Sequence, residues 1–396
     1  LNVAARLSSM GKPEEILVGQ NTYHQAEGYF NFAELDSISI KGKSEPIQIY
    51  KVLSLKEKPV KIHRLHGLRA DLIGRKVEMG QIVEAVHKLI KDKKGSVVSI
   101  CGAAGTGKSR LIEELRSDLN FNEIQWLEGH AYPHSQNIPY YPLKDLLNKT
   151  LQIEENDPPK MVKEKVENGI SRLVGEEISL VPYIGSLFSI SYPEIEDVSP
   201  EFWKLQLKKA VETTLTSLAQ NSPTIICLED LQWADPSFLD LLRLILSDIR
   251  EPLLFLCSYR FIVSIFTSHQ IAAMASIYKE VRLQDLSASE SQNMVESLLK
   301  ATSIPSDLQR FVQDKVEGNP FYIEEVINSL IETETLVKDN GGWKVTRPIS
   351  DADISSSIHG VISGRLDRLE VETKRILQEA SVIGRAFLYD ILTRVT

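Results

Sequence analysis

Short apolar runs alternate with helical patterns through the middle of this 396-residue chain. Four runs rich in β-branched and large apolar residues are candidate strands. They are "SVVSIC" (96–101), "EIQWLE" (123–128), "PTIICLE" (223–229) and "PLLFLC" (252–257). Amphipathic segments such as "KLQLKKAVETTLTSLAQ" lie between them and carry apolar residues at helical spacing. Strands that alternate with helices predict an α/β domain with a parallel sheet.

The flanking segments follow other patterns. The beginning of the chain combines a helix that ends at Gly11 with short strands in "EILVG", "FNFAEL", "SISI" and "PIQIYKVL". The stretch "KEKPVKIHRLHGLRA" is basic, contains proline and has no period, which is typical of a linker. After residue 283 the pattern is helical almost to the end. We therefore divide the chain into an α+β segment 1–53, a linker 54–70, an α/β core 71–283, a helical segment 284–345 and a final segment 346–396.

Composition narrows the class of protein. Hydrophobic residues make up 42% and charged residues 25%, and 54 acidic against 45 basic residues give a net charge of −9. This balance argues against nucleic acid or an anionic membrane as the main partner. Cys101, Cys227 and Cys257 lie in or beside apolar runs and are predicted to be buried free thiols in a reducing compartment. The uncharged stretch 261–278 contains several polar residues, which favours a packed helix over a membrane span. We expect a cytoplasmic protein.

A glycine-rich segment, "CGAAGTGKSRL", follows the first of the core strands and precedes a helical pattern. It contains G-x-x-x-x-G-K-[ST] in the strand–loop–helix context that a phosphate-binding loop needs. Backbone N–H groups and the positive helix end would face the phosphates, Lys108 would reach the β- and γ-phosphates, and Ser109 would ligate Mg²⁺. The alternative is a glycine-rich turn before a helix. The candidate nucleotide-binding residues are Gly102, Ala103, Ala104, Gly105, Thr106, Gly107, Lys108 and Ser109.

Two acids end another core strand. Glu229 and Asp230 follow "TIICL", and parallel strands would bring them to the same edge as the phosphate loop. We assign Glu229 to Mg²⁺, or to its water, and Asp230 to the orientation of the attacking water. Asp235 precedes a proline and an apolar helix, so an N-cap role is favoured for it over a chemical one.

These segments together resemble the STAND branch of AAA-related P-loop ATPases, the signal-transduction ATPases with numerous domains. The motifs are "LIGRKVEMGQI", the phosphate loop, "CLEDLQWAD", "LLFLCSYR" and "EGNPFYIEEV". The resemblance implies that backbone near Arg75 lines the adenine pocket, that Arg260 senses the γ-phosphate and that Pro320 and its neighbours touch the base from a helical lid. It also implies a winged-helix segment after the lid. Glu229 stands where the family usually has Asp, and the residues after Arg260 are apolar where a polar turn is common. The alternatives are that Arg260 caps or pairs at a sheet edge and that "GNP" is only a helix stop followed by a helix start.

Residues 1–53 resemble the last quarter of a class III adenylate/guanylate cyclase domain. The matching features are the N-x-x-x-R helix, the "ILVG" strand and the "KGKSEP" ending. The resemblance implies that Asn2 orients the ribose, that Arg6 stabilises the reacting phosphate and that Lys43 lies near a phosphate-contacting position. The alternative is that Asn2 and Arg6 are ordinary exposed helix residues. Cyclases of this class form their site across a dimer, so a homodimer is expected by analogy.

The sequence therefore suggests a fragment, cut at both ends, of a signalling protein in which a nucleotide cyclase is fused to a regulatory ATPase. Its expected cofactors are ATP and Mg²⁺. Two alternatives remain open: an ATP-switched scaffold with a degenerate cyclase domain, or a transcriptional regulator that uses the winged helix. The expected fold is a P-loop NTPase parallel sheet with a helical lid and a winged-helix segment, preceded by the α+β end of a cyclase domain.

Overall fold

The computed structural model describes most of the chain between residues 70 and 349 and several shorter segments outside it. The described residues are 7, 10–12, 15–20, 22–23, 30–38, 47–55, 70–119, 123–154, 156–247, 251–261, 265–301, 303–339, 342–349 and 373–377.

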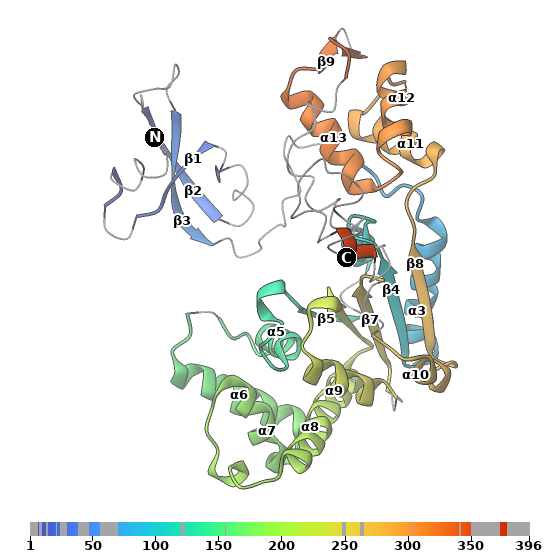
Figure 1. The fold of residues 1–396 in the computed structure, drawn as a ribbon. Helices are drawn as coiled ribbons and strands as arrows, with labels where there is room; N and C mark the ends of the chain where they lie inside the picture. Colours follow the sequence, from blue (N-terminus) through green and yellow to red (C-terminus); the bar gives the residue numbers. More distant parts are fainter. Residues whose placement is uncertain are drawn as a thin grey trace.

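A five-stranded sheet forms the centre of the core (Figure 1). Its strands are β4 (Ser96–Gly102), β5 (Gln125–His130), β6 (Thr224–Glu229), β7 (Leu253–Tyr259) and β8 (Tyr278–Leu283). The spatial order is β5-β6-β7-β4-β8, and all neighbouring pairs are parallel. The carboxyl ends of all five strands therefore lie at one edge, which is where ligands bind in open α/β sheets.

Helices cover both faces of this sheet, which confirms the predicted α/β class. The helices of the core are α3 (Lys76–Asp92), α4 (Lys108–Asp118), α5 (Tyr141–Thr150), α6 (Pro159–Val174), α7 (Val181–Gly185), α8 (Pro200–Asn221), α9 (Pro236–Leu246) and α10 (Ser268–Ala273). Successive side chains of a strand point to opposite faces. In β6, Ile225 and Cys227 pack with the core of α3 and α4, whereas Ile226 and Leu228 pack with that of α5 to α9. The continuous apolar run of β6 is the consequence.

A second, smaller unit follows β8 and has its own apolar core, which includes Val295, Leu308 and Ile323 (Figure 1). We call it the lid. Its elements are α11 (Ala288–Leu299), α12 (Ser306–Lys315), α13 (Pro320–Glu332), β9 (Leu336–Asp339) and β10 (Gly342–Val345). The all-helical prediction was wrong at its end, because β9 and β10 pair as an antiparallel hairpin. The "DNGG" turn signal and the alternation of Trp343 and Val345 against the lid core explain the hairpin.

Two further predictions about the core needed correction. The edge strand β8 was not predicted, because its "YKEVRL" sequence alternates charged and apolar residues instead of forming an apolar run. The uncharged stretch 261–278 is not one packed helix: among its described residues only the short α10 is helical, and β8 begins at Tyr278. No helix in the described part of the chain is long and apolar enough to cross a membrane. The three cysteines are buried and free, as predicted.

The N-terminal segment contains an antiparallel sheet of β1 (Leu17–Gly19), β2 (Phe30–Ile38) and β3 (Ile47–Leu55) in the order β1-β3-β2. The predicted strands "FNFAEL" and the start of "SISI" are one strand, β2, with an irregularity between Leu35 and Ile38. The predicted site residues Asn2, Arg6 and Lys43 lie outside the described residues, as does most of the predicted winged-helix segment.

Candidate functional site

The phosphate loop connects the end of β4 to the start of α4. Gly105 and Gly107 have φ of +79° and +93°, which only glycine adopts without strain. A Cβ atom on Gly105 would lie 2.5 Å from Oδ1 of Asn319. A Cβ atom on Gly102 would lie 2.6 Å from Thr106 Oγ1, and this hydroxyl donates a hydrogen bond to the Ala103 carbonyl over 2.9 Å. The glycine pattern is therefore required by the backbone and by close packing around the loop.

Lys108 begins α4 and is almost completely buried, with 8% of its surface exposed. Its Nζ atom donates to the carbonyl oxygens of Gly102 and Ala103 over 3.0 and 2.9 Å. Burial lowers the pKa of Lys108 to about 8, although the nearby Asp230 carboxylate favours its charged form. The ammonium group is thus held inside the loop where a phosphate would bind. The next residue, Ser109, is exposed at the same helix end.

The two strand-end acids occupy different environments. Glu229 is buried at the end of β6. Asp230 adopts a left-handed conformation with φ of 59°, and its N–H group donates to Ser258 Oγ on β7 over 3.2 Å. Asp230 is also the acid whose charge acts on Lys108. The turn at Asp230 thus directs the second acid toward the phosphate loop.

Gln232 links the second acid to the predicted phosphate sensor. Its Nε2 atom donates to Asp230 Oδ1 over 3.0 Å, and its Oε1 atom accepts from the Arg260 N–H over 3.1 Å. The Arg260 guanidinium lies over the Trp233 ring, 5.6 Å from its centroid. The charge of Arg260 also acts on Lys108. The charge of Lys108 therefore interacts with the charges of both Asp230 and Arg260. These two residues are in turn contacted by Gln232 and Trp233, to which the sequence analysis assigned no role.

His130, at the end of β5, also lies beside the first acid. Its Nε2 atom is 3.3 Å from Glu229 Oε1, and its Nδ1 atom is 3.3 Å from Asp145 Oδ2. Lys149 Nζ contacts the same Asp145 oxygen over 3.0 Å, so its ammonium group lies near the His130 ring. Burial disfavours the imidazolium, but the hydrogen bonds to Asp145 and Glu229 outweigh it and raise the pKa of His130 to about 9. Sequence reasoning missed His130, although a polar residue at the carboxyl end of a predicted parallel strand was an available signal.

The raised pKa of His130 predicts how the free energy of unfolding depends on pH. The folded-state pKa of about 9 exceeds the ordinary 6.5, so the contribution of His130 is complete below pH 6.5 and is lost as the pH rises through about 9. The unfolding free-energy difference between wild type and His130→Gln should fall over this window, by at most about 3 kcal/mol. Denaturant unfolding at both ends of the window measures it, and His87→Gln, on the exposed face of α3, is the control. A pH-independent difference would contradict an imidazolium at this position.

The lid touches the phosphate loop directly. Asn319 Nδ2 donates to the Ala104 carbonyl over 3.0 Å, and the Phe321 N–H donates to the Gly105 carbonyl over 3.2 Å. Asn319 Oδ1 accepts from the Tyr322 N–H and caps α13, and Pro320 is the first residue of that helix. "GNP" is therefore both a helix start, as its alternative interpretation held, and a contact with the loop.

Arg75 also contacts the phosphate loop, and its side chain is buried. Its Nη2 atom donates to the Thr106 carbonyl over 3.1 Å and to the Gln284 carbonyl over 2.5 Å. The guanidinium thus contacts protein carbonyls, whereas the role of the nearby backbone in binding adenine stays a prediction. Asp235 Oδ1 accepts from the Phe238 N–H over 3.0 Å, which confirms its predicted N-cap role.

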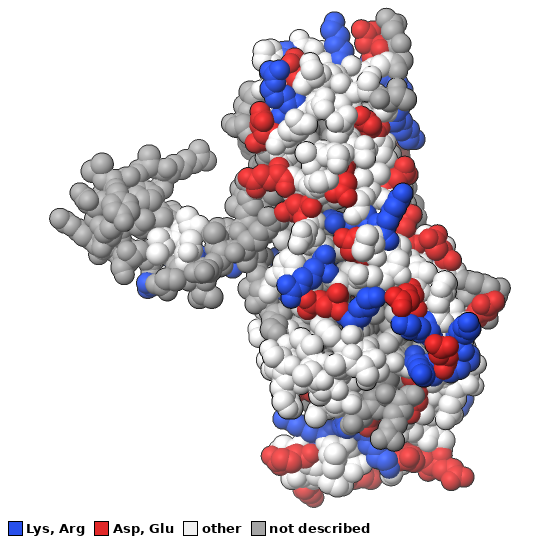
Figure 2. All heavy atoms as spheres, turned by 90° about the vertical axis from the view of Figure 1, so that its right-hand side faces the viewer, with Lys and Arg blue, Asp and Glu red and all other residues white. Residues whose placement is uncertain are grey.

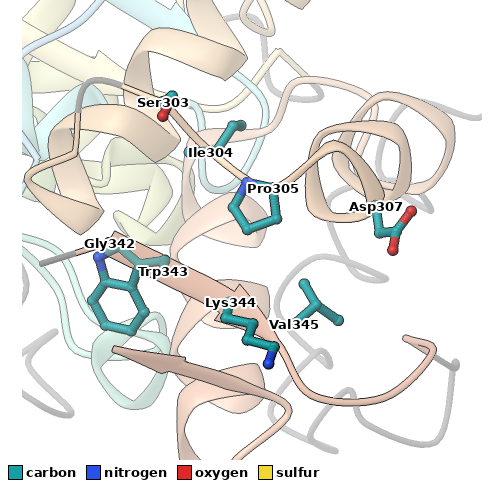
Figure 3. A pocket seen from close by; sticks show the side chains of 8 residues that line it. All are labelled: Ser303, Ile304, Pro305, Asp307, Gly342, Trp343, Lys344 and Val345. Atoms are coloured by element: carbon teal, nitrogen blue, oxygen red, sulfur yellow. The ribbon is translucent and has the colours of Figure 1, made fainter. Parts of the chain in front are cut away.

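A separate pocket of about 370 Å³ lies on the lid between the residues that precede α12 and strand β10 (Figure 3). Pro305, Asp307, Trp343 and Lys344 are among the residues that line it. None of its lining residues belongs to the phosphate loop or to the strand-end acids. Among the described residues no group of three or more His, Cys, Asp or Glu side chains could hold a metal ion.

Two segments of the chain are similar to known protein families. Residues 71–256 match the AAA ATPase domain. Residues 287–342, in the lid, match a domain of unknown function. The matched segment contains the phosphate loop and the strands β4, β5 and β6 of the parallel sheet, so this part of the chain is similar to an AAA ATPase domain.

Curated relatives are similar over more of the chain. An uncharacterized protein of Rhizobium meliloti is 25% identical over 61% of this chain and 23% of its own length. Adenylate cyclase type 10 of Oryctolagus cuniculus is 23% identical over 85% of this chain and 21% of its length. The Mus musculus adenylate cyclase type 10 is 21% identical over 100% of this chain and 27% of its length. The chain thus spans about a quarter of the length of these relatives.

Two of the solved structures that align with this chain do so at low similarity. The Aeropyrum pernix ORC1 protein in complex with DNA aligns with a TM-score of 0.39 and 14% identity over 80% of this chain and 73% of its own. A STAND protein with a tetratricopeptide repeat sensor from Pyrococcus horikoshii aligns with a TM-score of 0.32 and 14% identity, over 84% of this chain and 38% of its own.

Proposed function

We propose that this chain binds Mg·ATP at the phosphate loop, hydrolyses it slowly and uses the bound nucleotide as a regulatory switch. The observation that carries this proposal is the buried Lys108 inside a glycine loop, with Asp230 and Arg260 as its charged neighbours. The lid contacts on the Ala104 and Gly105 carbonyls give the nucleotide a way to affect the lid. The AAA ATPase domain match supports the same conclusion.

The residues take the following roles in this proposal. Lys108 neutralises the β- and γ-phosphates, and the backbone from Gly102 to Ser109 donates hydrogen bonds to them. Ser109 and Glu229 hold Mg²⁺, which when bound neutralises charge on the phosphate oxygens. Asp230 orients the attacking water, and Arg260 contacts the γ-phosphate. Backbone near Arg75 and at Pro320 borders the adenine.

The wider proposal is a signalling protein in which this ATPase regulates a class III cyclase that forms a cyclic nucleotide and pyrophosphate from ATP or GTP. The motifs of residues 1–53 support it, as does the similarity of the whole chain to an adenylate cyclase type 10. Asn2 and Arg6 would then act on the ribose and the reacting phosphate, in a cytoplasmic homodimer. The alternatives are an ATP-switched scaffold and a transcriptional regulator with a degenerate cyclase domain.

Surface charge favours the signalling proposal over a DNA-binding one. Figure 2 shows Lys and Arg interspersed with Asp and Glu on one face of the molecule, so its described residues offer no extended basic surface there. The net charge of −9 points the same way.

The experiment that tests the ATPase proposal uses the 396-residue chain. We expect isothermal titration calorimetry to show binding of Mg·ATP at one site, and a coupled phosphate assay to show slow turnover. If the folded chain binds no Mg·ATP, the proposal is wrong.

A further prediction concerns the cyclase-like segment, residues 1–53. The chain alone should form no cyclic AMP or cyclic GMP above a protein-free control, because its cyclase-like segment resembles only the last quarter of that domain and lacks the metal-binding aspartates. Mass spectrometry after incubation with Mg·ATP or Mg·GTP measures the product. Cyclic nucleotide formed by the chain, and absent with Arg6→Ala, would show that the residues needed for cyclisation lie within it.

A further inference from the structure

A buried arginine joins three segments that are far apart in the sequence. Arg75 precedes α3, and its Nη2 atom donates to the Thr106 carbonyl in the phosphate loop and to the Gln284 carbonyl. Gln284 directly follows β8 and begins residues 284–287, the connection to the lid, which we call the hinge. Glu78, on the first turn of α3, contacts the other guanidinium nitrogen over 3.4 Å. One nitrogen atom therefore holds both the loop and the hinge.

The segment before Arg75 packs between the core and the lid. Leu72 packs against the apolar core beneath α3 and α4, whereas Ile73 packs against that of the lid. The Asp71 N–H donates to Ser297 Oγ on α11 over 2.9 Å. A displacement of the lid would therefore pull on the segment that carries Arg75.

The glycine before Arg75 has no room for a side chain. Gly74 has φ of +69°, and a Cβ atom there would lie 2.5 Å from Glu290 Oε1. Glu290 belongs to the capping box that begins α11, where its carboxylate accepts from the Ser287 N–H over 2.8 Å. The start of the lid thus rests directly on the backbone that orients Arg75.

We infer that Arg75 is a positioning residue that couples the lid to the phosphate loop, so that a nucleotide at the loop stabilises one position of the hinge. This inference rests on the proposed function. The Asn319 side chain makes a second connection, on the Ala104 carbonyl. The loop is therefore held to the hinge by Arg75 and to α13 by Asn319 and the Phe321 N–H, and movement of the lid must break or keep these connections.

Removal of the guanidinium has a definite physical consequence. Both carbonyls would lose a charged donor, and glutamine is neutral and shorter than arginine, so it cannot reach both carbonyls at once. Arg75→Gln should weaken Mg·ATP binding by about tenfold, since the loop loses one support but keeps Lys108. Arg75→Lys keeps the charge and can restore one carbonyl contact, so its affinity should be intermediate.

The decisive measurement is hydrogen–deuterium exchange in the hinge and at residues 316–322, with and without Mg·ATP. In the wild-type chain, ATP should slow exchange in both segments by about fivefold or more. In Arg75→Gln at saturating ATP, this protection should be lost in the hinge. Arg110→Gln, which removes an arginine that pairs with Glu113 and Glu114 on α4, is the matched control and should behave as wild type.

A double-mutant cycle provides the second measurement. If Arg75 and Asn319 serve one coupling, the affinity losses of Arg75→Gln and Asn319→Ala should not multiply in the double variant. Multiplicative losses, or full hinge protection in Arg75→Gln with ATP bound, would overturn the inference. If Arg75→Gln does not fold, the same two measurements are made with Arg75→Lys, and ATP protection of the hinge equal to wild type would overturn it. A wild-type chain that binds no ATP would instead refute the proposed function.

Discussion

Replacement of Lys108 by alanine should weaken Mg·ATP binding by roughly a hundredfold or more. The ammonium is buried, donates to two loop carbonyls and would exchange these for charged phosphate oxygens, and each charge-assisted hydrogen bond of this kind contributes about 1.5–3 kcal/mol. A loss of 1.4 kcal/mol corresponds to a factor of ten in affinity. Isothermal titration calorimetry of the wild-type and variant chains measures the difference.

The buried lysine also makes ATP binding depend on pH in a characteristic way. Burial lowers the pKa of Lys108 to about 8. Above that pH, the Lys108 side chain is therefore neutral in a growing fraction of the ATP-free molecules. Phosphates raise this pKa again on binding. Binding near and above pH 8 should therefore take up protons, and binding well below pH 8 should not. Calorimetry in buffers with different ionisation enthalpies detects the uptake.

The matched control for both measurements is Lys88→Ala. Lys88 is an exposed lysine on α3 that pairs with Glu84, and its removal should change neither the affinity nor the proton uptake. Equal affinity of the wild type and Lys108→Ala would contradict the assignment of the phosphate loop.

The second large effect is expected at Asp230. Asp230→Asn keeps the shape of the side chain and its contact with Gln232 but removes the charge that polarises water, so the rate of hydrolysis should fall on the order of a hundredfold or more. ATP binding should be retained, because the loop backbone is unchanged and bound phosphates themselves favour the charged form of Lys108. Single-turnover hydrolysis and equilibrium binding together separate the two effects. Asp240→Asn, an exposed acid on α9 that pairs with Arg243, is the control.

The neighbouring acid should respond differently. Glu229→Gln replaces a carboxylate with an amide, a poorer ligand for Mg²⁺, so it should raise the Mg²⁺ concentration needed for half-maximal turnover. A Mg²⁺ titration of the ATPase rate for the wild type and both variants decides between the two roles. If Asp230→Asn turns over at the wild-type rate, Asp230 does not orient the water. If it is Asp230→Asn that raises the Mg²⁺ requirement, the two acids have exchanged roles.

The structure adds a physical reason to expect a difference between these acids. Glu229 Oε1 lies against His130, whereas Asp230 lies on the side of Lys108 and contacts Gln232. Neutralisation of Glu229 therefore also removes a partner of a buried imidazolium, and part of its effect should follow the protonation of His130.

Short-range features of this protein could be predicted from the sequence. The phosphate loop, its helix and the N-cap at Asp235 each depend on residues within a few positions of one another, so local spacing carries the information. Continuous apolar runs identified the three central strands β4, β6 and β7, because a strand buried on both faces must be apolar throughout. The edge strand β5 was also predicted, although "EIQWLE" contains polar residues and only part of the strand is buried. The edge strand β8 was not predicted from the sequence, because its exposed positions carry charges that interrupt a continuous apolar run.

The sequence by itself thus determined the class of fold, the phosphate loop and the pair of acids. The tertiary structure decided which distant residues support them. The strand order β5-β6 brought His130 beside Glu229, and no spacing in the chain encodes that adjacency. Arg75 contacts carbonyls 31 and 209 positions away, and Asn319 contacts one 215 positions away. Backbone carbonyls carry no residue identity, so a contact with them leaves no pattern in the sequence, and only the packing of the lid on the core reveals it.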